Sequence, residues 1–251
     1  MNLKIRYCLQ NILKVGEKME RTVLITGGNK GIGLETTQLF LEKDYKVIAL
    51  GRDFKDFPFD EGENLRKINF NLRDVDDIPN LINSLGEIDI LVNNAGIMNS
   101  LSYNSYPKDD MESILKVNLE APIKLIIEVS KSMIKNKFGR IVNVASVAGE
   151  IGHPDIWYGV TKAGLINATK SFAKILGDKG VLINAVAPGP VETEMLKIIP
   201  DSRKNSLRAS TYTKRFAKPL EIAKTILWLS TEVPEYINGI CIDINNGAFP
   251  R

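Results

Sequence analysis

Short runs of β-branched and apolar residues alternate with longer helical segments from Thr22 onward, and this alternation constrains the fold more than any other feature. Most of the runs are apolar at successive positions, which is typical of strands buried on both faces. Strands separated by helical segments form βαβ units with a parallel sheet. The pattern predicts a doubly wound α/β domain with seven strands, at residues 22–26, 46–50, 66–70, 88–92, 140–144, 181–187 and 239–244.

The segments between these strands show how the 251 residues are organised. Helices are predicted at residues 32–43, 111–135, 158–176 and 219–230, and no linker divides the chain. We expect residues 19–251 to form one domain, and residues 1–18 to be an extension that is disordered or, if the chain starts at Met19, not translated. The polar stretches 97–110 and 188–217 are predicted to be irregular. Both leave strands at their carboxyl ends, where open α/β sheets bind ligands, so we expect them to form a substrate lid.

Composition excludes several classes of protein. A hydrophobic content of 44% supplies a sizeable core, and a net charge of +3 is too balanced for a protein that binds nucleic acid mainly by charge. No apolar run is long enough to span a membrane, and the N-terminal segment lacks the continuous apolar region of a signal peptide. The two cysteines, Cys8 and Cys241, and the single histidine, His153, do not predict a metal site or a disulfide framework. These features indicate a cytoplasmic protein without a metal.

A glycine-rich turn directly follows the first strand and opens the first helix. Glycines let the backbone approach a pyrophosphate closely, and the amino end of the helix offers N–H groups and a partial positive charge. The spacing is a TGxxxGxG variant of the dinucleotide-binding fingerprint. We expect Gly27, Asn29, Lys30, Gly31, Ile32 and Gly33 to bind the phosphates of a dinucleotide.

The end of the second strand indicates which dinucleotide is bound. An acidic residue there would hold the adenosine ribose and repel a 2′-phosphate, but this chain has Gly51 followed by Arg52. Arg52 and Lys30 supply positive charge where NADP carries its additional phosphate. The sequence therefore favours NADP (NADPH) over NAD, with two solvated surface cations as the alternative interpretation.

A second group of polar residues suits proton transfer. Ser146 ends the fifth strand, and Tyr158 and Lys162 are four residues apart on one face of the predicted helix. An adjacent ammonium group favours the phenolate, so Tyr158 is predicted to exchange a proton with a substrate oxygen near neutral pH. Ser146 would hydrogen-bond the same oxygen, and Asn118 would hold Lys162 through a water.

In their order along the chain these motifs resemble the short-chain dehydrogenase/reductase family, from about Arg21 to Phe249. The resemblance rests on the glycine turn, on Asn93-Asn94-Ala95-Gly96 after the fourth strand, on the four polar residues above and on Pro188-Gly189. It implies a Rossmann-type fold with a seven-stranded parallel sheet flanked by helices, a catalytic tetrad of Asn118, Ser146, Tyr158 and Lys162, and a homotetramer or homodimer joined through the two long helices. It also implies cofactor contacts from Asn71, Leu72, Asn94, Ala95, Gly96, Tyr158, Lys162, Pro188, Gly189, Val191 and Thr193.

Within the family the length and the C-terminal segment look most like 3-oxoacyl-acyl-carrier-protein reductases of fatty-acid biosynthesis. Such enzymes bind an acidic carrier through basic residues beside the active-site mouth, and Lys137 and Lys179 match those positions. The basic run at residues 203–215 is interpreted either as a solvated face or as an attractor of anionic ligands. Ser146 and Tyr158 are 12 positions apart, one fewer than is common in the family, so substrate contacts from the loop that holds His153 stay open.

Two alternative functions remain. One is the reduction or oxidation of another ketone or alcohol, such as a sugar, a steroid-like molecule or a xenobiotic. The other is a cofactor sensor without catalysis, which would not need a phenol and an ammonium group one helical turn apart.

Overall fold

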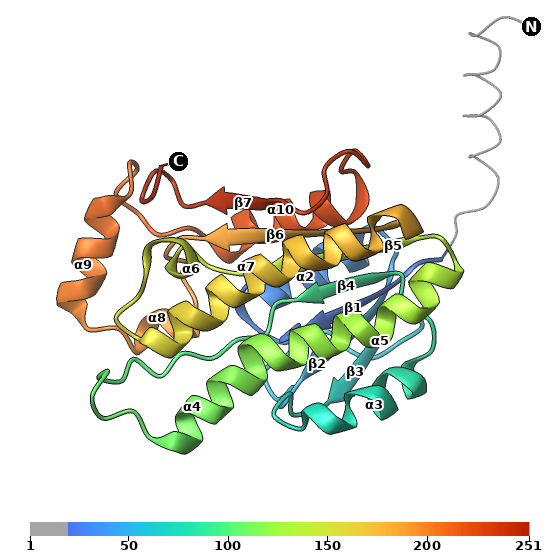
Figure 1. The fold of residues 1–251 in the computed structure, drawn as a ribbon, viewed down its shortest axis with the longest axis horizontal. Coiled ribbons are helices and arrows are strands. Elements are labelled where there is room, and N and C mark those ends of the chain that lie inside the picture. Colours follow the sequence, from blue (N-terminus) through green and yellow to red (C-terminus); the bar gives the residue numbers. More distant parts are fainter. Residues whose placement is uncertain (1–19, 251) are drawn as a thin grey trace, which may run out of the picture.

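The structure is a computed structural model that describes residues 20–250, so the predicted extension at residues 1–18 lies outside the described residues. Its centre is a parallel sheet of seven strands in the order β3-β2-β1-β4-β5-β6-β7, as Figure 1 shows. The strands are Thr22–Thr26 (β1), Lys46–Gly51 (β2), Leu65–Asn69 (β3), Ile90–Asn93 (β4), Gly139–Val144 (β5), Val181–Pro188 (β6) and Cys241–Ile244 (β7). The predicted fold class is confirmed, and each predicted strand lies within two residues of an observed one.

Helices cover both faces of the sheet (Figure 1). On one face lie α3 (Ile78–Leu85), α5 (Ala121–Lys135) and α7 (Ile156–Leu176), and on the other α2 (Gly31–Glu42) and α10 (Pro219–Thr231). Alternate side chains of each central strand enter the two cores, as Leu24 and Ile25 of β1 do. The central strands are buried from end to end because both their faces are covered.

The carboxyl ends of the strands are covered by short elements, which Figure 1 shows beyond the arrowheads of β6 and β7. These elements are α6 (Ala148–Ile151), α8 (Glu194–Lys197) and α9 (Asp201–Ser210). The prediction of an irregular stretch at residues 188–217 was therefore wrong in part, because the stretch contains α8 and α9. No residue of α9 is buried, so it has no apolar period that would have indicated a helix.

The long helix predicted at residues 111–135 is divided in the structure. It begins as α4 (Lys108–Leu115), passes through a π-helical turn at Lys116–Glu120, and continues as α5. The predicted irregular stretch at residues 97–110 thus ends three residues early. π-Helical turns inside helices are frequent at functional sites, and this one carries Asn118.

Helices long and apolar enough to cross a membrane are absent from the part of the chain that the structure describes.

Candidate active site

The glycine turn connects β1 to α2 in a conformation that requires glycine. Gly27 and Gly31 have φ angles of +62° and +53°, in the left-handed region. A Cβ atom on Gly33 would lie 2.0 Å from the Gly27 carbonyl oxygen, so no side chain fits there. The N-cap residue Lys30 makes no side-chain cap, which leaves the first N–H groups of α2 available to an anion.

The end of β4 is tied to this turn by hydrogen bonds. The Asn94 side chain donates to the carbonyl oxygens of Thr26 (2.9 Å) and Gly27 (3.2 Å). The Thr26 hydroxyl accepts from the backbone N–H groups of Asn94 and Ala95, both at 3.0 Å. β1 and β4 lie at the point where the strand order reverses, and α/β sheets bind ligands in the crevice there. These bonds therefore fix the two edges of the crevice relative to each other.

At the end of β2 the space beside Gly51 is occupied by Asn29. A Cβ atom on Gly51 would lie 2.9 to 3.2 Å from the Asn29 amide atoms, and that amide donates to the Asp53 carbonyl oxygen. Arg52 is exposed and lines the same cavity as Lys30 and a second arginine, Arg73. Three cations thus surround this end of the cavity, beside the exposed carboxylate of Asp53.

Lys162 is buried between α7 and the sheet. Its side chain is 3% exposed, and Nζ donates a 2.7 Å hydrogen bond to the Val144 carbonyl oxygen at the end of β5. Nζ lies 5.8 Å from the centre of the Tyr158 ring. Burial lowers the pKa of Lys162 to about 8, because desolvation disfavours the ammonium form.

Tyr158 lies one helical turn earlier and is 8% exposed. Burial raises the pKa of its phenol, a hydrogen bond with the Ser146 side chain lowers it, and the charge of Asp155 raises it. The net direction is upward, so the phenol is neutral at neutral pH. The spacing of Tyr158 and Lys162 indicated that the ammonium lies near the phenol, but it gave no measure of desolvation, which acts on the pKa in the other direction.

Asn118 holds the backbone of the adjacent loop. It is fully buried, its Oδ1 accepts from the Ile97 N–H at 2.8 Å, and its Nδ2 donates to the Ile97 carbonyl at 2.8 Å and to the Thr161 hydroxyl at 3.2 Å. A Cβ atom on Gly96 would lie 3.3 Å from Lys162 Nζ and 3.5 Å from Asn118 Oδ1. Asn118 and Lys162 thus meet behind Gly96, which puts Asn118 within reach of the lysine but outside the cavity.

Asp155 connects the loop before α4 to α7. Its carboxylate caps α7 through the Tyr158 N–H and accepts from the N–H groups of Asn99 (3.0 Å) and Ser100 (2.9 Å) and from the Tyr106 hydroxyl (3.4 Å). Burial, followed by the Asp155 charge, raises the pKa of Tyr106 to about 12. One carboxylate therefore fixes the loop beside the buried phenol.

These elements enclose one cavity of about 1000 Å³. It is lined by all the predicted site residues except Gly33 and Asn118, which lie behind its wall. The predicted lid stretches 97–110 and 188–217 supply a set of lining residues: Ile97, Met98, Asn99, Met195, Leu196, Ile199, Arg203 and Leu207. At the other end of the cavity, sequence reasoning missed Asp53, Phe70 and Arg73. Arg203 and Leu207 are four residues apart on one face of α9, but α9 has no apolar period, so the sequence carries no signal that singles them out.

The cavity fits a dinucleotide. One end of the cavity holds the glycine turn, the uncapped amino end of α2 and three cations. From there the cavity reaches the buried phenol and ammonium group, near the carboxyl end of β5 and the amino end of α7. Beyond Tyr158 the lining is mainly apolar, from Met98, Met195, Leu196, Ile199 and Leu207. We call these five residues the lid wall. The arrangement can hold an extended anionic ligand at one end and an apolar molecule at the other.

Lys137 and Lys179 lie elsewhere. They are exposed and precede β5 and β6 by two residues each, at the amino ends of strands whose carboxyl ends face the cavity. The expectation that these two lysines lie beside the mouth of the active site of their own chain was therefore wrong. They lie at the amino ends of β5 and β6, and the length of these strands separates them from the cavity at the carboxyl ends.

The sequence and the fold match known proteins over most of the chain. A family model described as short chain dehydrogenase matches residues 21–204. The 3-oxoacyl-[acyl-carrier-protein] reductase FabG of Thermotoga maritima is 36% identical over 238 residues, which are 90% of this chain and 97% of the relative. FabG of Aquifex aeolicus is 35% identical over 90% of this chain and 96% of its own length.

Among solved structures, that of ElxO with NADP bound has a TM-score of 0.84 at 33% identity, covering 93% of this chain and 100% of the other. A tyrosine-to-phenylalanine variant of ElxO with NADPH bound matches with the same TM-score of 0.84 at 32% identity and the same coverage.

Proposed function

The chain belongs to the short-chain dehydrogenase family, and from that premise we propose that it is an NADPH-dependent reductase that converts a 3-oxoacyl thioester to the 3-hydroxyacyl product. The observation that carries the proposal is the buried pair of Tyr158 and Lys162 at the junction of a dinucleotide-shaped crevice and an apolar lid wall. The family and the NADP-bound structural relatives support the general reaction, a hydride transfer between a nicotinamide and a carbonyl or alcohol group.

NADP binds along the crevice between β1 and β4. The glycine turn and the amino end of α2 hold the pyrophosphate, and Lys30, Arg52 and Arg73 hold the 2′-phosphate, because arginine binds phosphate through paired hydrogen bonds. Asn71, Leu72, Asn94, Ala95 and Gly96 line the adenosine side, and Pro188, Gly189, Val191 and Thr193 line the nicotinamide side. When bound, NADPH supplies the hydride.

Tyr158 supplies the proton. Its phenol is kept neutral by burial and by the Asp155 charge, and a neutral phenol is the form that donates to a developing alkoxide. Ser146, which is hydrogen-bonded to the phenol, orients the carbonyl oxygen. The Lys162 ammonium stabilises the phenolate that remains after the transfer, and Asn118 holds the backbone in front of that ammonium.

The 3-oxoacyl substrate, carried on acyl-carrier protein, is favoured by the FabG relatives and by the apolar lid wall, which suits an acyl chain. The proposed reaction belongs to fatty-acid biosynthesis. Reduction of another ketone is the second candidate function, because the apolar lid wall would also accept an apolar ketone that is not a thioester.

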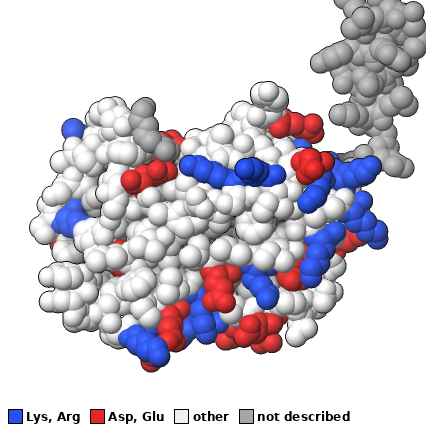
Figure 2. Space-filling view, in the orientation of Figure 1, with Lys and Arg blue, Asp and Glu red and all other residues white. Residues whose placement is uncertain are grey.

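We also propose that the protein is a homotetramer or homodimer joined through α5 and α7. Five apolar side chains on these helices are between 37% and 55% exposed: Ile127, Ile134, Ile156, Val160 and Ile175. Figure 2 shows that the middle of the face containing α5 and α7 carries few charges.

NADPH oxidation with an acetoacetyl thioester tests the function. Tyr158→Phe is expected to lower the rate by at least about 10²-fold, the low end for general acid catalysis, while NADPH binding measured by fluorescence stays unchanged. Retained turnover in the variant would refute the role of the phenol. A wild-type protein that reduces other ketones but not the thioester would establish the second candidate, and one that binds NADPH without reducing any carbonyl would be a sensor.

A further inference from the structure

One guanidinium group enters the lid part of the cavity. Arg203 lies on α9 and lines the cavity beside Ile199 and Leu207. Its Nη2 atom is 2.7 Å from Nε2 of His153. Among residues 20–250, Arg203 forms no ion pair with a carboxylate. Glu194, an acidic residue that also lines the cavity, is paired with Lys197 at 2.7 Å.

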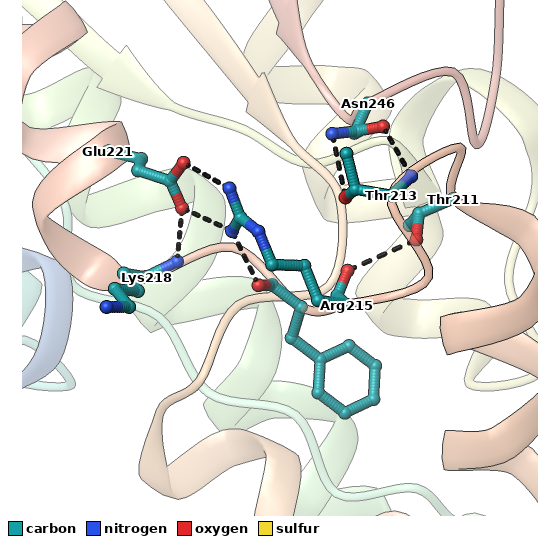
Figure 3. Close-up of polar contacts among 7 residues, drawn as sticks. Thr211, Thr213, Arg215, Lys218, Glu221 and Asn246 are labelled. Atoms are coloured by element: carbon teal, nitrogen blue, oxygen red, sulfur yellow. Dashed lines mark hydrogen bonds and ion pairs between the residues drawn. The ribbon is translucent and has the colours of Figure 1, made fainter.

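The other cations of the basic run are engaged elsewhere. Arg215 makes a two-pronged ion pair with Glu221, both contacts at 2.7 Å, and this pair lowers the pKa of Glu221 to about 2 (Figure 3). Lys204 pairs with Asp201 at 3.0 Å, Lys214 donates to the Ala209 carbonyl, and Arg208 lies over the Phe216 ring. None of these four lines the cavity. Of the two interpretations of the basic run, attraction of a ligand therefore applies to Arg203 alone.

His153 must be neutral to hold Arg203. A guanidinium group has donors only, so Nε2 of His153 accepts and this nitrogen carries no proton. The other ring nitrogen, Nδ1, lies 3.2 Å from the Asp155 carbonyl oxygen and 3.1 Å from the Asp155 backbone nitrogen. Burial, followed by the Arg203 charge, lowers the pKa of His153. A neutral imidazole positions the guanidinium but does not neutralise it.

The position of the guanidinium is defined relative to the phenol. The rings of His153 and Tyr158 lie 5.1 Å apart, centre to centre, so Arg203 is held one imidazole ring away from the tyrosine. One of its five N–H donors is used by His153, which leaves others for a ligand. A charged donor beside the five apolar residues of the lid wall is a specificity element, because it favours a substrate with an acceptor oxygen at that place.

We propose that Arg203, positioned by His153, binds the oxygen on C1 of a 3-oxo substrate while Tyr158 and Ser146 bind the oxygen on C3. This inference rests on the proposed function and narrows it: the site selects 1,3-dicarbonyl compounds over simple ketones. The C1 oxygen can belong to a thioester or to a free carboxylate, and both accept from a guanidinium group.

The test compares Arg203→Met with wild type on three substrates: acetoacetyl-N-acetylcysteamine, acetoacetate and the simple ketone cyclohexanone. We expect the substitution to raise KM at least about 10-fold for the substrate that provides the C1 oxygen, because it removes a charge-assisted hydrogen bond. For cyclohexanone, kcat/KM should change by less than about twofold. A rise for the thioester only, or for acetoacetate only, identifies the source of that oxygen. Lys204→Met, which removes a cation of the same helix that does not line the cavity, is the matched control.

Binding provides a readout that does not depend on turnover. Calorimetric titration of 3-hydroxybutyryl-N-acetylcysteamine and of 3-hydroxybutyrate in the presence of NADP should show weaker binding of at least one of them to Arg203→Met, with cyclohexanol as the control ligand. His153→Phe, which removes the acceptor, should weaken the same ligand, and Arg203→Lys should restore part of its binding. An equal effect on all ligands, or none, would overturn the proposal even if the wild type reduces the thioester. A wild type that reduces none of the three ketones would refute the proposed function, and the titrations would still decide the role of Arg203.

Discussion

At the scale of single residues, cofactor preference depends on charge at the end of β2. Arg52→Ala is expected to raise the Kd of NADPH at least about 10-fold and that of NADH less than about twofold, because only NADPH has a phosphate for the guanidinium. Fluorescence titration measures both constants. Lys55→Ala, which removes a nearby cation that does not line the cavity, should leave both unchanged. Equal losses for the two cofactors would show that Arg52 does not contact the phosphate.

The burial of Lys162 gives a prediction about stability and pH. The pKa of a solvated lysine is 10.5 and that of Lys162 in the fold is about 8, so burial disfavours the ammonium form at neutral pH. The unfolded chain binds this proton more tightly, and the cost to stability is complete below pH 8 and disappears as the pH rises to about 10.5. Lys162→Met should therefore stabilise the ligand-free protein near pH 7 by about 2 kcal/mol, after allowance for the lost bond to Val144.

Urea unfolding of wild type and Lys162→Met near pH 7 and again near pH 10 measures the effect. The difference between the two proteins should shrink at the higher pH. A difference that does not change with pH would mean that the ammonium form is not penalised by burial. The Lys162→Met variant should be inactive at both pH values. Lys162 would then be a residue that the reaction requires although it lowers the stability of the fold.

At the scale of elements, the outward faces of α5 and α7 account for assembly. Val160 is 49% exposed on the side of α7 opposite Lys162, and Val160→Glu would place an unpaired charge in the proposed interface. We expect light scattering during gel filtration to show a smaller assembly than that of wild type. Tyr236→Glu, at a fully exposed position that is not part of these helices, should keep the wild-type mass. A monomeric wild type would contradict the interface.

At the scale of the whole molecule, the sheet was predictable and the lid was not. Strands such as β5 and β6 are buried along their whole length, so their apolar runs are visible in the sequence. The helix α9 buries no residue and has no such pattern. The motifs predicted which residues form the site, but two of its properties can be seen only in the structure. The protonation of Tyr158 depends on burial. Arg203 differs from the four other cations of the basic run by its contact with His153.

The contact between Gly51 and Asn29 limits how a protein of this kind can change its cofactor. An acidic side chain at position 51 would accept the ribose hydroxyls of NAD, but the Asn29 amide already fills that space and is bonded to the Asp53 backbone. A carboxylate introduced there alone would first collide with the asparagine. The Asn29 side chain would have to turn away and lose its bond to the Asp53 carbonyl, so the effect of a carboxylate at position 51 depends on the residue at position 29.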